Sequence, residues 1–185
     1  IAATSGRSFW ILDDLSLIRQ FKKDTTNFEF FKPSPAILVN GYSEMDSNDP
    51  NFNGSNPVNG VNPATGAVLY YFLPDAKSDA PLELDIMDSN GKLVRRFSSV
   101  KDSLFQQYDG GPPSEPTLSK SKGLNRFVWN LRHHTMPGVP DVYIESSYRG
   151  HKSIPGTYYL HLKHGDISKK VTMNIQPNPL YSTSQ

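Results

Sequence analysis

One stretch of the chain carries oxygen-bearing side chains at the spacing that calcium loops use. Asp49, Asn51 and Asn53 alternate ahead of Gly54, so their oxygens could face one pocket while the glycine permits a sharp turn. Gly60 stands where an EF-hand places its bidentate Glu. The alternative is a loop in which Asn and Asp side chains cap local turns. Calcium is therefore a weak candidate here, and the sequence indicates no other cofactor.

The histidines are spaced poorly for a metal site. They are His133, His134, His151, His161 and His164. Neighbouring residues on a strand face opposite ways, so His133 and His134 would not share a metal, and the same parity separates His161 from His164. We interpret all five as surface or structural residues, and we predict no catalytic, cofactor-binding or histidine metal site.

Two pairs of carboxylates raise the question of glycoside hydrolysis, which uses paired acids. Asp13 and Asp14 precede an expected helix, where N-capping explains them. Asp85 and Asp88 belong to a strand and the turn that follows it, and no apolar pocket is predicted around either pair. We therefore expect no hydrolase activity from this chain.

The aromatic residues offer a second kind of chemistry, stacking on sugars. We expect Tyr71 and Tyr159 to be the exposed rings and therefore the ligand candidates, although cross-strand packing is the alternative for both. Trp129 alternates with Phe127 and Leu131, which predicts a core position. Tyr158, which comes after Pro155-Gly156-Thr157, resembles the tyrosine that ties a sandwich corner by its hydroxyl.

The elements that must position these residues are mainly strands. Strands are predicted at Ala67–Leu73, Leu82–Asp88, Lys92–Phe97, Asn125–Arg132 and Thr157–His164, with a last strand presenting Val171, Met173 and Ile175 inward. Before them we expect a hairpin within residues 1–12, a short helix from Leu15 to Phe21, extended chain around Pro33 and Pro35, and a long Asn-rich loop from Asn40 to Gly66. Strands separated by turns, without a long helical period, indicate an all-β, antiparallel sandwich.

Composition narrows the class of protein further. The 185 residues hold 19 basic and 18 acidic side chains, a net charge of +1 that argues against bulk electrostatic binding of nucleic acid. Cysteine is absent, which excludes disulfides and thiolate metal sites. No apolar run approaches the roughly 18 residues of a membrane span.

Several segments, taken in order, resemble secreted bacterial proteins of the sortilin-like, BNR-repeat "glycosyl hydrolase" group. Residues 3–14 (ATSGRSFWILDD) and Phe31-Lys32-Pro33 resemble the end of that group's last propeller blade and the exit from it, with Ser5 where the group commonly has His. The other segments resemble its C-terminal immunoglobulin-like domain, which is also similar to the module of flagellar hook-capping proteins; they are Gly66–Leu73, Leu82–Phe97, Gly123–Arg132 and Pro155–Leu162.

The resemblance implies a propeller upstream of this chain, with any catalytic residues located there. We expect a blade remnant and linker at residues 1–35, an extended segment and loop at 36–66, an immunoglobulin-like sandwich at 67–177 and a tail at 178–185. The implied role is a non-catalytic accessory domain, extracellular or periplasmic, that contacts its propeller or another protein. The alternative is a carbohydrate-binding module that uses exposed aromatics.

Overall fold

The chain forms ten strands and one short helix among the residues that the computed structural model describes, namely 2–3, 9–10, 14–22, 25–39, 64–75, 79–142 and 144–180. The elements are β1 (Ala2–Ala3), β2 (Phe9–Trp10), α1 (Leu15–Gln20), β3 (Glu29–Phe30), β4 (Ala36–Ile37), β5 (Ala67–Leu73), β6 (Leu82–Met87), β7 (Leu93–Ser98), β8 (Gly123–Trp129), β9 (Gly156–His164) and β10 (Ile167–Gln176).

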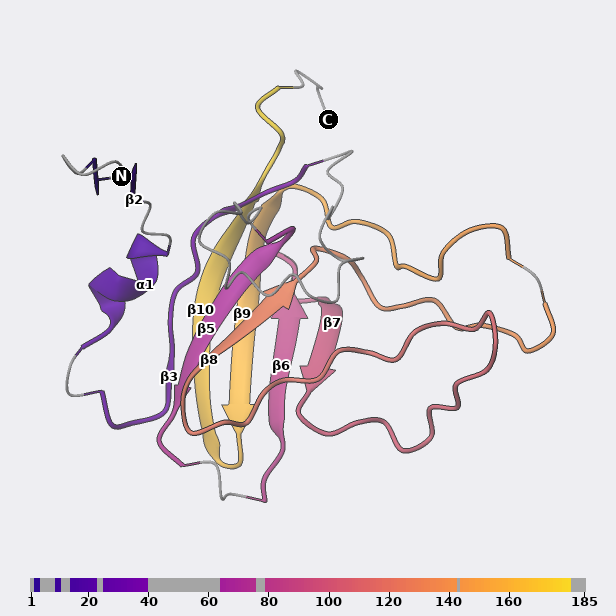
Figure 1. Cartoon of the computed structure of the whole chain (residues 1–185), viewed down its shortest axis with the longest axis horizontal. Coiled ribbons are helices and arrows are strands. Elements are labelled where there is room, and N and C mark those ends of the chain that lie inside the picture. Colours follow the sequence, from indigo (N-terminus) through magenta and orange to yellow (C-terminus); the bar gives the residue numbers. More distant parts are fainter. Residues whose placement is uncertain are drawn as a thin grey trace.

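Two sheets lie face to face, the smaller in front of the larger in Figure 1. The larger sheet has the strand order β4-β10-β9-β6-β7, and the smaller has the order β3-β5-β8. The all-β fold in two sheets is therefore confirmed. The prediction of a wholly antiparallel arrangement is wrong at one edge, where β4 runs parallel to the end of β10. β4 has two residues, too few to show a pattern in the sequence.

The space between the sheets is filled by the alternating residues of the long strands. Leu69, Tyr71 and Leu73 of β5 face this core, and so do Tyr158, Leu160 and Leu162 of β9, as the period of two requires. The aromatic rings of Phe97 and Phe127 meet edge to face across the two sheets with their centroids 4.7 Å apart. Burial of this apolar surface is the main force holding the sheets together.

Residues that precede the predicted sandwich also join it. Phe28, Phe30 and Ala36 belong to the buried core, and β3 and β4 pair with strands of the two sheets. Each of the segments 1–35 and 36–66 therefore contributes a strand to one of the two sheets. Of the predicted tail at 178–185, the structure describes residues 178–180.

The N-terminal predictions are confirmed in part. β1 and β2 pair antiparallel, as the expected hairpin requires, and α1 covers most of the expected helix. The prediction that Asp14 caps α1 is wrong: its backbone has a φ of 55°, and its side chain forms no cap hydrogen bond. Asp13 lies outside the described residues. In the described part of the chain, no helix has the length and apolar content to cross a membrane.

Two long connections leave the sandwich on the same side, to the right in Figure 1. They span residues 99–122, between β7 and β8, and residues 130–155, between β8 and β9. A side chain added at Gly138 of the second connection would collide with the hydroxyl of Tyr108 and with Pro112 of the first. The two connections therefore pack closely against each other.

Candidate functional site

The two tyrosines that were expected to be exposed differ in the exposure of their rings. The prediction for Tyr71 is wrong, because its ring is 1% exposed and its hydroxyl donates to the Ser119 carbonyl oxygen at 2.7 Å. Burial raises the pKa of this phenol. Tyr159 is 45% exposed on the outer face of β9. Of the two ligand candidates, Tyr159 alone presents its ring to a solute.

The structure confirms the other two aromatic predictions. Trp129 is fully buried, and its ring meets that of Tyr158 edge to face with centroids 5.7 Å apart. Its indole N–H donates to the backbone oxygen of Arg132 at 2.9 Å. The Tyr158 hydroxyl donates to the Ile154 oxygen at 2.8 Å, which fixes the corner before β9. Both rings therefore serve the fold.

The candidate carboxylates are occupied by structural partners. Asp85 accepts hydrogen bonds from Arg96 Nη2 at 3.0 Å and Lys163 Nζ at 2.8 Å, and a further one from Arg96 Nε. Burial alone would raise the pKa of Asp85, but these two cations outweigh it and lower the pKa. Asp88 Oδ1 accepts the backbone N–H groups of Asn90 and Lys92, each at 2.9 Å, and so closes the turn before β7.

Asp14 is occupied as well. It accepts a hydrogen bond from the Tyr70 hydroxyl at 2.5 Å, which ties the start of α1 to the outer face of β5. Burial and the Asp14 carboxylate together raise the pKa of Tyr70. The carboxylates that the sequence offered for hydrolysis, as far as the structure describes them, thus hold strands, a turn and a helix in place.

One histidine pair was not foreseen. His133 and His151 stack with ring centroids 3.7 Å apart and planes 23° apart, and the backbone N–H of His133 donates to the His151 backbone oxygen at 3.0 Å. The pKa of His133 is lowered mainly by burial and to a lesser extent by the charge of His151. Their contact joins the two arms of the 130–155 connection.

The described residues hold no group of three metal-ligating side chains, and the calcium candidate at Asp49, Asn51 and Asn53 lies outside them.

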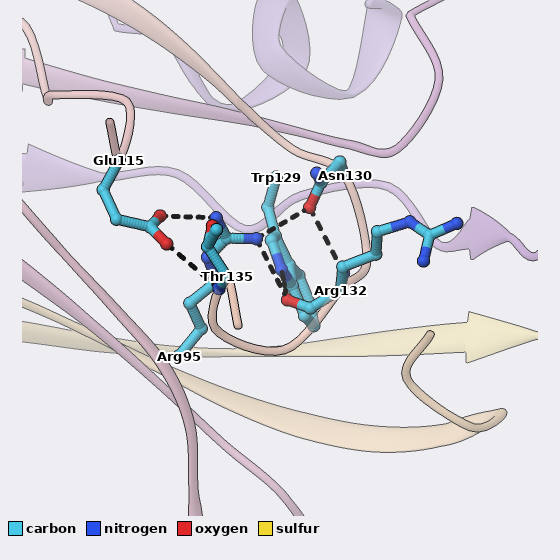
Figure 2. A network of polar contacts seen from close by, with 6 residues as sticks. All are labelled: Arg95, Glu115, Trp129, Asn130, Arg132 and Thr135. Carbon is cyan, nitrogen blue, oxygen red and sulfur yellow. Dashed lines mark hydrogen bonds and ion pairs between the residues drawn. The ribbon is translucent and has the colours of Figure 1, made fainter. Parts of the chain in front are cut away.

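A polar network that sequence reasoning missed lies beside Trp129 (Figure 2). Its centre is Arg95, which is 4% exposed and faces the inside of the sandwich. Arg95 Nη1 donates to Asn130 Oδ1 at 3.0 Å and to the Arg132 backbone oxygen at 3.3 Å, while Nη2 forms an ion pair with Glu115. The guanidinium also lies over the Phe97 ring, 4.7 Å from its centroid.

Glu115 extends this network to the second connection. Its Oε1 accepts the Thr135 N–H at 3.1 Å. Burial would raise the pKa of Glu115, but the hydrogen bonds from Arg95 and Thr135 lower it, which keeps the carboxylate charged. The sequence carried one signal of this network: because Phe97 faces inward, the period of two places Arg95 on the same face. Nothing in the Pro/Ser-rich stretch around Glu115 marks it as the partner.

A hollow of about 180 Å³ opens next to the network, and we call it the arginine pocket. Three arginines are among the residues that line it, Arg95, Arg132 and Arg149. Apolar side chains form another part of the wall and include Phe97, Pro113 and Val128. An arrangement of this kind can hold a small anion, since a guanidinium matches the geometry of a carboxylate.

No family model matches the chain, and no solved structure matches it.

Proposed function

We propose that the chain is a non-catalytic accessory or interaction domain of immunoglobulin-like architecture. The sequence resemblance supports a place at the C-terminus of a secreted propeller protein, extracellular or periplasmic, with that propeller or another protein as the partner. The two-sheet fold and the Tyr158 corner are features that such a sandwich would have.

The observation that carries this proposal is that the side chains considered for catalysis or binding have structural roles in the fold. The carboxylate of Asp85 joins cations from two neighbouring strands, Tyr71 and Trp129 lie in the core, and Asp14 is bound to Tyr70. Side chains engaged in this way stabilise a scaffold. The two long connections then supply the surface that varies most freely and so suits recognition.

A carbohydrate-binding module is the second candidate, and one observation favours it. The Tyr159 ring is 45% exposed on the outer face of the larger sheet, in register with Met87 on one side and Thr172 on the other. An exposed ring on a rigid strand can stack on a sugar face.

Affinity electrophoresis in gels that contain neutral polysaccharides separates the two candidates. We expect the wild-type chain to migrate as it does in a gel without polysaccharide, because a single exposed tyrosine offers little stacking area. The matched variants are Tyr159→Ala and, as control, Thr172→Ala at the neighbouring exposed position of β10. Retardation of the wild type that Tyr159→Ala abolishes and Thr172→Ala retains would put the carbohydrate-binding module first.

A further inference from the structure

The arginine pocket carries more positive charge than its neighbours neutralise. Glu115 is the acidic partner in the network, and both of its oxygens are already engaged, one with Arg95 and one with the Thr135 N–H. Arg132 donates to the Gly150 oxygen through Nη1 at 2.7 Å, and its guanidinium extends away from Glu115 in Figure 2. Arg149 is exposed and has no hydrogen bond or ion pair with any residue that the structure describes.

The donors that remain match an anion. A guanidinium has five N–H groups, so Arg132 and Arg149 retain most of theirs. Arg95, another of the lining residues, has a buried Nε donor without a partner in the described part of the chain. Buried donors without acceptors cost free energy, and a carboxylate drawn to these cations would lower the electrostatic cost of keeping three of them together.

The walls favour an amino-acid side chain over a sugar. A volume of about 180 Å³ suits one side chain, well below the roughly 300–1,000 Å³ of pockets for larger ligands. Sugars bind on exposed aromatic faces, but Phe97 is 2% exposed and the Arg95 guanidinium lies over its ring. Pro113 and Val128 offer apolar contact to a short aliphatic stem.

We propose that the arginine pocket binds a Glu or Asp side chain of a protein partner, with Arg132 and Arg149 as the groups that contact its carboxylate. Arg95, fixed by Glu115 and Asn130, adds a further positive charge to the lining of the pocket. This inference rests on the proposed role as an interaction domain, and it names the chemistry by which the partner would be recognised.

The test is an NMR titration that follows the arginine Nε–Hε resonances while blocked glutamate, N-acetyl-glutamate N-methylamide, is added. We expect saturable shifts of Arg132 and Arg149 with a dissociation constant of about 1–10 mM, as befits one side chain taken from a larger interface. Blocked glutamine, which has the same shape without the charge, should give no saturable shift. Arg149→Gln should weaken binding about 5-fold, and Arg132→Gln with Arg149→Gln at least about 10-fold.

Arg19→Gln, at an exposed position of α1, is the matched control and should leave the affinity unchanged. Because Arg149 has no partner in the described structure, its variant retains the wild-type unfolding midpoint and remains informative even if the double variant loosens the connection. The absence of a saturable shift, an equal response to blocked glutamine, or an unchanged affinity in Arg149→Gln would each overturn the inference.

A parallel titration with glucuronate tests whether the carboxylate comes from an acidic sugar and not from a protein side chain. Tighter binding of glucuronate than of blocked glutamate would overturn the assignment to a protein side chain. Failure of these titrations leaves the non-catalytic role intact, whereas glycoside turnover by the chain would overturn that role without altering the titrations.

Discussion

Trp129 shows how much of the fold depends on a single residue. Its ring lies on β8 of the smaller sheet and contacts Tyr158 on β9 of the larger one. Its indole N–H also holds the backbone oxygen of Arg132, which accepts a hydrogen bond from Arg95 as well. The residue thus connects the two sheets to the polar network beside the arginine pocket.

We expect Trp129→Ala to lower the free energy of unfolding by about 3–5 kcal/mol, the usual cost of removing a large buried aromatic ring. Urea denaturation at neutral pH measures this change. Leu124→Ala is the matched control, since Leu124 lies on the same strand but is 45% exposed, and it should cost less than about 1 kcal/mol. Equal stability of the two variants would contradict the core assignment of Trp129.

Individual residues show where the sequence pattern assigns a side chain to the correct face of a strand and where it does not. Arg126 and Asn130 flank the segment that holds the inward Phe127 and Trp129, so the alternation assigns these residues to a face although Val128 lies between the two rings. The run AVLYYFL of β5 has no such separation, because Phe72 on its outer face packs near Phe21 of the N-terminal segment, with centroids 6.2 Å apart. A strand covered on both faces loses its alternation, and Tyr71 was therefore predicted on the wrong side.

At the scale of elements, one carboxylate joins three neighbouring strands. Asp85 of β6 lies opposite Arg96 of β7 in register, and Lys163 of β9 reaches the same carboxylate. Cross-strand pairs of opposite charge stabilise sheets. This triad holds the β9-β6-β7 part of the larger sheet in its register.

Because of this triad, the free energy of unfolding depends on pH in the acid range. The pKa of Asp85 is lowered below its ordinary value of 3.8 in the folded chain, so the folded state binds fewer protons than the unfolded state in that range. The stabilisation is fully present above about pH 3.8 and is lost as the pH falls through the lowered pKa. Asp85→Asn should cost about 1–3 kcal/mol at neutral pH, because it removes a charged partner of two cations.

Urea denaturation of the wild type and Asp85→Asn from neutral pH to about pH 2.5 tests this linkage. The difference in unfolding free energy should shrink as the pH falls below 3.8. Asp166→Asn, in the exposed turn between β9 and β10, serves as the control and should stay within about 0.5 kcal/mol of the wild type. A difference that stays constant over the whole range would contradict the role given to Asp85.

The elements themselves were predictable to different degrees. The turn after Asp88 was predicted from its residue types, and Gly91 there has the positive φ of 77° that such turns favour. The register shift between Ile86 and Met87 was not predicted, since one extra residue leaves no pattern in the sequence. The parallel pairing of β4 depends on a contact with β10 at the far end of the chain.

At the scale of the whole molecule, the polar network collects residues that the sequence keeps far apart. Arg95 bonds Glu115, Asn130 and Arg132 at separations of 20, 35 and 37 residues. Their meeting depends on the close packing of two long connections, which local sequence patterns do not encode. The arginine pocket could therefore be found only once the fold was known, whereas the core-facing residues could be read from their period.

A turnover assay tests most directly the proposal that this chain has a non-catalytic role. Purified chain should release no product from a panel of aryl glycosides and polysaccharides beyond the rate of buffer alone, because Asp85 and Asp14 are held by structural partners. The variants Asp13→Asn, Asp14→Asn and Asp85→Asn are assayed alongside it. Turnover by the wild type that any of these variants abolishes, while retaining its fold, would contradict the account.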